Sequence, residues 1–138
     1  MINYFSKNDF ILKNKLKRKK WLKNVIEQEG CRLGDVNYIF CSDEQLLEIN
    51  IQYLNHDFYT DIITFDYKEN HLISGDIFIS IDRVRDNAVI NYEEFDKELN
   101  RVMVHGILHL IGYNDKSDKD VKLMRKMENI YISLYKNY

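Results

Sequence analysis

The stretch VMVHGILHLIGYND, residues 102–115, decides the fold that we expect for this chain. Read as a helix, it carries apolar residues on nearly every side, and such a helix is stable when it is buried inside the molecule. We therefore expect a central helix that a sheet and other helices surround. The apolar positions that define it are Val102, Met103, Val104, Ile107, Leu108, Leu110 and Ile111.

Two histidines interrupt this apolar surface at a spacing that suits a metal ion. His105 and His109 stand at i and i+4, so both imidazoles leave the same face of the helix. Gly112 can end the helix and let the chain fold back, which brings Asp115 toward the histidines. Two imidazoles and a carboxylate leave one zinc position open, as in catalytic sites. Asp115 could instead be only a cap or turn residue.

The residue after the first histidine argues against one class of zinc enzyme. In HExxH proteases a glutamate there takes the proton from the zinc-bound water, whereas this chain has Gly106. Peptide hydrolysis by that mechanism is therefore not expected. A metal ion could still act on a phosphodiester or stabilise charge that develops on phosphate oxygens.

The composition indicates one globular domain over residues 1–138. Apolar residues make up 45% of the chain and aromatic residues 13%, which is enough for a packed core. There is no run of apolar residues long enough to cross a membrane and no apolar signal core, so we expect a cytoplasmic protein without membrane contact. Cys31 and Cys41 form no CxxC pair, and we interpret them as reduced thiols.

Positive charge is concentrated at the start of the chain. Residues 1–24 carry a net charge of +7, so the rest of the chain is acidic. A polyanion such as RNA could bind this segment, although a solvated helix face explains the same pattern. The candidate RNA-binding residues are Lys17, Arg18, Lys19, Lys20 and Lys23.

Periodicity and capping signals predict the remaining elements. We expect an α/β domain, α+β-like in character, in which a small mixed sheet of about four strands packs with several helices around the metal site. The expected helices cover residues 14–29, 42–54, 91–111 and 117–131, and the expected strands cover 36–40, 61–65 and 75–80, with a hairpin loop or edge turn at 68–71. The capping signals are Ser42 with Gln45, Asn91 with Glu94, and Ser117 with Asp120.

Taken together, the motifs HGILHLIGY, TDIITF and GDIFIS resemble the YbeY family of rRNA maturation factors. The similarity covers roughly residues 36–130 and includes Asn50, Tyr53, Asp57 and the segment from Arg83 to Ala88. The resemblance implies a compact α/β fold, a zinc site and a single-strand-specific endoribonuclease. It also implies action on the 3′ end of small-subunit rRNA, a part in ribosome quality control, and no DNA partner.

The chain departs from the family pattern at the third metal ligand. The family commonly ends this motif as GYDH, with the last histidine as ligand, whereas this chain reads Asn114-Asp115. A carboxylate ligand lowers the net charge of the site by one. We therefore expect zinc, with a weaker preference for it over other divalent ions such as manganese.

A second departure concerns the cation that would contact the reacting phosphate. Leu54 stands where the family typically has an arginine, and leucine offers neither charge nor a bidentate contact. Arg83 is our candidate replacement and catalytic residue, and an ordinary surface arginine is the alternative. Asp61 and Asp76 each lie beside an expected strand, where capping or turn roles are favoured over catalysis.

Three functions are compatible with these residues. The first is a metal-dependent endoribonuclease that acts on single-stranded rRNA of the small ribosomal subunit. The second, which Leu54 favours, is a ribosome-associated assembly factor that keeps the metal site and has little or no nuclease activity. The third is a peptidase-like hydrolase, which Gly106 argues against.

Overall fold

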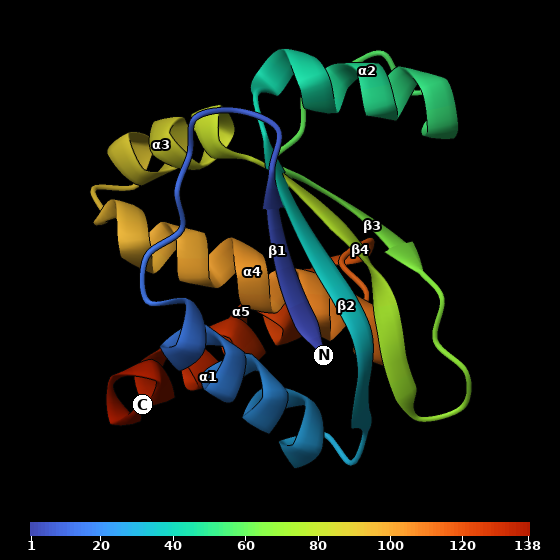
Figure 1. Ribbon diagram of the computed structural model, residues 1–138, viewed down its shortest axis with the longest axis vertical. Helices are drawn as coiled ribbons and strands as arrows, with labels where there is room; N and C mark the ends of the chain where they lie inside the picture. The colour runs from blue at the N-terminus through green and yellow to red at the C-terminus, as the bar shows by residue number, and fades with distance from the viewer.

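Four strands and five α-helices make up the computed structural model, which describes residues 1–138 (Figure 1). A short 3₁₀ helix, Tyr135–Asn137, follows the last of them. In chain order the elements are β1 (Ile2–Ser6), α1 (Lys15–Gln28), β2 (Arg32–Cys41), α2 (Asp43–Leu54), β3 (Ile62–Asp66), β4 (Leu72–Ser80), α3 (Ile81–Ile90), α4 (Phe95–Ile111) and α5 (Asp118–Leu134).

The strands form one mixed sheet in the order β1-β2-β4-β3. β1 and β4 both pair with β2 in parallel, and β3 pairs with β4 in antiparallel fashion across the hairpin. A parallel pair needs a crossover connection, and α1 provides it between β1 and β2. The expected small mixed sheet within an α/β fold is thus confirmed.

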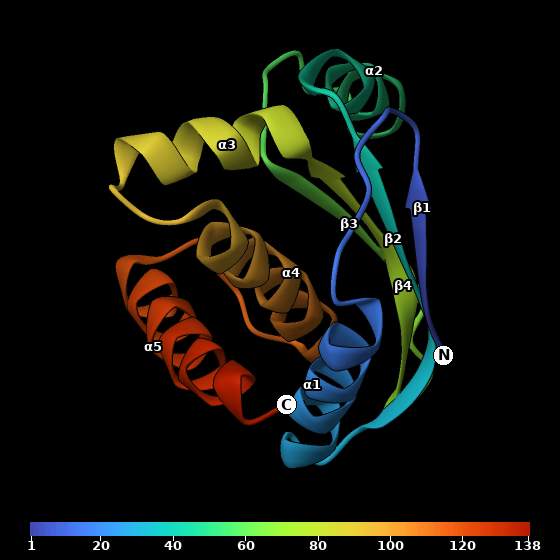
Figure 2. The ribbon, with the colours of Figure 1, turned by 60° about the vertical axis from the view of Figure 1, so that its left-hand side comes forward.

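One face of the sheet carries most of the core. Alternate residues of β2 and β4 point toward this face, as the two-residue period of a strand requires. Helices α1 and α4 cover it, and α5 packs on α4 (Figure 2). The buried strand residues of this face are Val36, Tyr38, Phe40, Ile73, Ile77 and Ile79.

Helix α4 is the central helix that its apolar sequence predicts. It contacts β3 and β4 on one side and α5 on another, with α1 and α3 against its remaining surface. Gly106 allows the close approach to the sheet, because a Cβ atom there would lie 2.9 Å from Cγ2 of Ile77. None of the helices combines the length and the apolar composition needed to cross a bilayer.

Two of the three expected helix caps are confirmed. The Ser42 side chain accepts from the backbone N–H of Gln45, whose side chain accepts from Ser42 N–H in return. Ser117 caps α5 by accepting from the N–H of Asp120. The third prediction is wrong: Asn91 is the C-cap of α3, and α4 begins four residues later without a side-chain cap.

The sequence did not predict β1 or α3. β1 is a five-residue edge strand in which only Ile2 is buried, so its apolar alternation is weak. α3 follows β4 without a loop, because Ser80 is both the last strand residue and the N-cap, accepting from the N–H of Arg83. The sequence therefore has no polar loop between β4 and α3 that would mark their boundary.

Candidate metal centre

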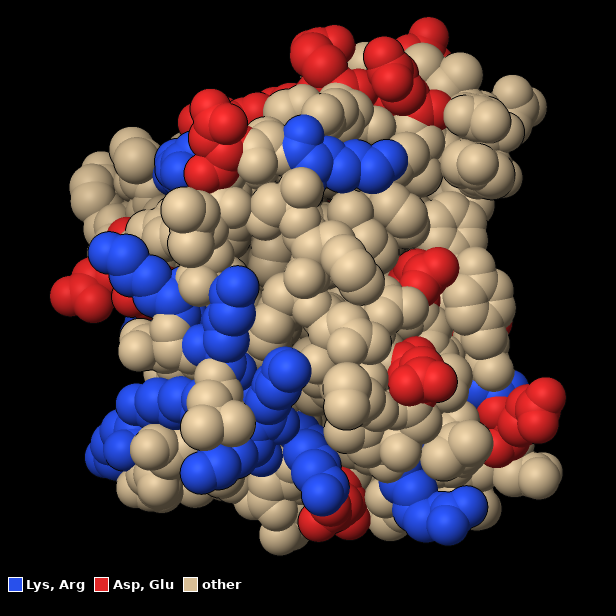
Figure 3. All heavy atoms as spheres, in the orientation of Figure 1, with Lys and Arg blue, Asp and Glu red and all other residues tan.

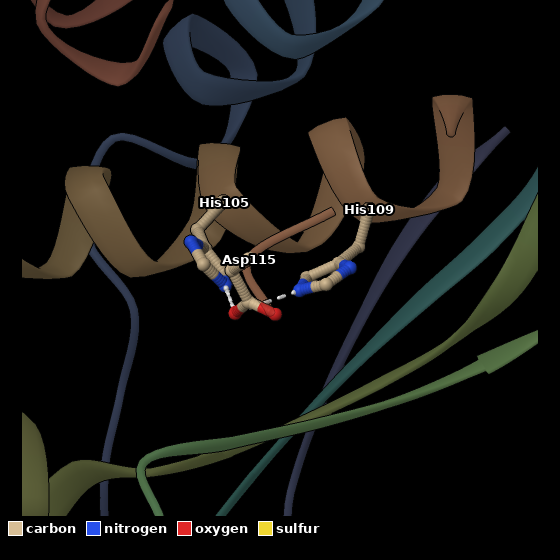
Figure 4. A group of neighbouring side chains, drawn as sticks. All are labelled: His105, His109 and Asp115. Carbon is tan, nitrogen blue, oxygen red and sulfur yellow. Dashed lines mark hydrogen bonds and ion pairs between the residues drawn. The ribbon is translucent and has the colours of Figure 1, made fainter. Parts of the chain in front are cut away.

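The two histidines of α4 and the aspartate beyond its end converge on one point (Figure 4). Oδ2 of Asp115 lies 3.2 Å from Nε2 of His109 and 3.5 Å from Nε2 of His105. All three candidate ligand atoms lie within 4.8 Å of one another. Bonds of about 2.1 Å to a tetrahedral zinc ion place ligand atoms about 3.4 Å apart. The two separations from Asp115 match an edge of that tetrahedron, and the third, between the two histidines, is no more than 4.8 Å. The donor set and its spacing therefore fit a metal ion.

Gly112 produces the chain reversal that the sequence predicts. Its φ of +129° lies in a region that side-chain-bearing residues rarely adopt. The N–H of Tyr113 then donates to the carbonyl of Leu108 at 2.9 Å, which closes the end of α4 and turns the chain back. The Tyr113 hydroxyl donates to Oε1 of Glu29 at 2.6 Å, so α1 holds the loop that carries Asp115.

A buried carboxylate on α5 contacts the far side of the first histidine. Oε2 of Glu128 lies 2.7 Å from Nδ1 of His105, and Oε1 accepts from Arg101 at 3.2 Å. Burial alone would lower the pKa of His105, but the hydrogen bond to Glu128 and the charges of Glu128, Asp61 and Asp115 together raise that pKa. Sequence analysis missed Glu128, and the only available signal was its position on the same stripe as Met124 and Tyr131 of α5.

The three candidate ligands lie on the wall of a cavity of about 500 Å³. Asp61 also lines it, and burial raises the pKa of its carboxyl group, so it is a cavity residue as well as a neighbour of β3. Asp76 instead lies within β4, outside this lining, and accepts from Asn37 of β2 at 3.0 Å. Other polar residues around the cavity are Thr60, Thr64, Asn87, Asn91, Glu98, Arg101, Arg125 and Glu128.

A family model described as "Endoribonuclease YbeY" matches residues 3–136. The chain belongs to the YbeY endoribonuclease family. It is 47% identical to a relative of that name from Christiangramia forsetii, over 97% of this chain and 94% of the relative. A second such relative, from Flavobacterium johnsoniae, is 50% identical over 98% of this chain and 97% of its own. A solution structure from Thermotoga maritima aligns with a TM-score of 0.68 at 31% identity, covering 98% of this chain and 89% of that one.

Family membership confirms the resemblance that the motifs indicate. The structure also shows where the residues that depart from the family pattern lie in this YbeY chain. Leu54 ends α2 and does not line the cavity. Arg83 does not line it either, because its guanidinium is bound to Asp43 at 2.9 Å and lies over the ring of Tyr59. The prediction that Arg83 reaches the reacting phosphate is therefore not supported, and Arg101 and Arg125 are the arginines of the cavity.

The basic segment lies on α1, which packs near the β1–β2 side of the sheet, away from the β3 edge. Lys20 and Lys23 are exposed, and Lys17 and Lys19 are half-buried with their ammonium groups over tyrosine rings. Arg18 is a correction to the sequence analysis. Only 1% of it is exposed, and it donates to Asn100 and to the carbonyl of Lys13, so it is not available to RNA.

Proposed function

We propose that this YbeY-family protein is a metal-dependent endoribonuclease that cuts single-stranded RNA in the cytoplasm. The RNA that we propose is the 3′ end region of small-subunit rRNA, which places the protein on the ribosomal small subunit in maturation and quality control. Relatives over nearly the whole chain carry the name endoribonuclease. The observation that carries the proposal is the convergence of His105, His109 and Asp115 beside a cavity of about 500 Å³.

These three residues would hold one divalent ion, and zinc suits two imidazoles and a carboxylate at the measured spacing. A zinc ion bound there supplies Lewis-acid chemistry at a phosphodiester. The chain's own contribution is to fix the ligands. α4 sets the two imidazoles one turn apart, and the bonds of Tyr113 to Leu108 and Glu29 hold the loop of Asp115.

We propose that Arg125 binds the phosphate, in place of the arginine that the family typically has at the position of Leu54. Its side chain is 59% exposed, and Nη1 lies 3.7 Å from a Glu128 oxygen. Because this contact is long and exposed to solvent, the guanidinium of Arg125 is free to turn toward a phosphate. Arg101 is less suited, because it is 12% exposed and bound to both Glu128 and Asn129.

The test is cleavage of a single-stranded rRNA fragment by the zinc-loaded protein, with the same fragment annealed to its complement as a control. We expect cleavage of the single strand, and a loss on the order of 100-fold or more in His109→Ala and Asp115→Ala. Lys68→Ala is the matched control variant, because Lys68 pairs with Asp66 on the β3–β4 hairpin, away from the site.

Binding of the RNA without cleavage, at equal affinity in wild type and Asp115→Ala, would contradict the nuclease and favour the assembly factor. That alternative draws its support from Leu54. Casein hydrolysis that requires His109 would favour a peptidase. Gly106 faces Ile77 and Ile62 of the sheet, so the position that carries the base in HExxH proteases does not face the metal site.

A further inference from the structure

We infer that Glu128 is a positioning residue for the metal site, which fixes the tautomer and the orientation of the His105 ring. The inference rests on the metal site proposed above and concerns a residue outside the metal-binding motif. Glu128 lies on α5, which runs beside α4 (Figure 2). Its carboxylate meets the His105 ring on the side opposite the other two ligands.

The two nitrogens of His105 have different partners. Nδ1 lies 2.7 Å from Oε2 of Glu128, whereas Nε2 lies 3.5 Å from Oδ2 of Asp115. A carboxylate only accepts hydrogen bonds, so Nδ1 must carry the proton and donate it to Glu128. The lone pair is then on Nε2, which is the atom that faces the candidate ligands. A metal-binding histidine usually has such a partner on its second nitrogen, which sets the ring orientation and increases its basicity.

The position of Glu128 is itself fixed by its neighbours. Its side chain is 6% exposed, and its second oxygen accepts from Arg101 Nη1 at 3.2 Å. Arg101 in turn donates to Asn129 at 2.9 Å and lies 3.9 Å from Glu98. A buried carboxylate with cationic partners on one oxygen and a histidine on the other has little freedom to rotate.

His109 has no corresponding partner. Its Nε2 contacts Asp115, and no hydrogen bond joins its Nδ1 to another protein group. The two histidines therefore play unequal parts: His105 is oriented before any ion binds, and His109 is free to adjust. Glu128 contacts His105 and neither of the other candidate ligands, so a substitution at Glu128 should affect metal binding chiefly through His105.

The test is zinc affinity, measured by chelator competition on the full-length protein. We expect a fall of roughly 10-fold in Glu128→Gln, which keeps an acceptor oxygen but loses the charge, and up to roughly 100-fold in Glu128→Leu. ¹⁵N NMR of the metal-free protein, at a pH where the His105 ring is neutral, should show the Nδ1–H tautomer of His105 in wild type and a mixture of tautomers in Glu128→Leu.

Asp43→Asn is the matched control. Asp43 is a half-buried carboxylate bound to an arginine, Arg83, but it lies outside the metal cavity and contacts neither histidine. It should lower thermal stability as Glu128→Gln does, with zinc affinity within about 2-fold of wild type. Wild-type affinity in Glu128→Leu, or an unchanged tautomer, would overturn the inference, as would a wild type that binds no divalent ion. A protein that binds zinc but cuts no RNA would contradict only the proposed nuclease.

Discussion

Gly106 occupies the place of the catalytic glutamate of HExxH proteases, yet the structure turns this position toward the sheet. We expect Gly106→Ala to lower the free energy of unfolding by up to about 2 kcal/mol. Its Cβ would crowd Ile77 and Ile62, which costs about 1–3 kcal/mol, and the better helix propensity of alanine recovers about 1 kcal/mol. Gly106→Glu would bury an unpaired carboxylate and cost several kcal/mol more, with no gain of proteolysis. Urea denaturation measures the stability of both variants, and casein hydrolysis measures proteolysis. A Gly106→Glu variant as stable as wild type would contradict the placement of Gly106 against the sheet.

The candidate ligands could be predicted from the sequence because local geometry determines them. His105 and His109 are one helical turn apart, and Gly112 allows the reversal that brings Asp115 back. Glu128 could not be predicted, because its contact with His105 joins residues 23 positions apart and depends on how α5 packs on α4. Arg18 was misjudged for the same reason, since nothing in a run of lysines shows which cation the fold will bury.

At the scale of elements, the ligand loop is held by α1. Glu29, just after α1, accepts from the hydroxyls of Tyr113 in the loop and Tyr131 in α5. We expect Tyr113→Phe to lower the free energy of unfolding by about 1–2 kcal/mol and zinc affinity several-fold, because the loop that carries Asp115 is freed. Tyr131→Phe loses the same kind of bond but leaves the loop attached, so it should lower stability alone.

The contribution of Tyr113 should also depend on pH. Burial and the hydrogen bond to Glu29 raise its pKa to about 12, from an ordinary value near 10. The folded protein then holds the phenolic proton more tightly than the unfolded chain, so this stabilisation is complete below pH ~10 and declines toward pH 12. Denaturation of wild type and Tyr113→Phe across this range measures it. If the difference in unfolding free energy between the two proteins grew with pH, the hydrogen bond would not be the source of the stabilisation.

Elements with a clear hydrophobic period or a capping residue at one end could be predicted, and elements without either could not. α2 and α5 were placed by Ser42 and Ser117, each of which accepts the expected backbone hydrogen bond. The sequence does not predict α3, because α3 starts where β4 stops, and its C-cap, Asn91, has the residue type expected at the start of α4. Asn and Asp suit both ends of a helix, so a capping residue alone does not show which helix it belongs to.

At the scale of the whole molecule, the basic surface and the metal site lie toward opposite edges of the sheet. Figure 3 shows Lys and Arg side chains gathered in the region where Figure 1 places α1. Lys20, Lys23 and Arg32 line a hollow there, whereas the metal cavity includes Thr60 to Ile62 near the β3 edge. Four strands at about 4.8 Å spacing separate these edges by about 15 Å, so a dinucleotide with its single internal phosphate could not occupy both places.

We therefore expect the lysines of α1 to matter only for long RNA. In Lys20→Gln/Lys23→Gln, affinity for a single strand of about 20 nucleotides should fall on the order of tenfold near 0.1 M salt. The slope of log affinity against log salt concentration should become less steep by about 1.4, because each of the two lost phosphate contacts with single-stranded RNA contributes about 0.7. Binding of a dinucleotide and zinc affinity should stay unchanged.

Lys68→Gln controls for the loss of positive charge as such, because Lys68 is paired with Asp66 on the hairpin. Equal losses in this control and in the double variant would mean that RNA responds to net charge and not to the α1 surface. An equal loss for the dinucleotide would place the lysines at the cleavage site itself. An unchanged salt dependence would mean that Lys20 and Lys23 form only a solvated face, as the sequence also allowed. The prediction therefore separates the two interpretations of the N-terminal charge, because a solvated face releases no counterions when RNA binds.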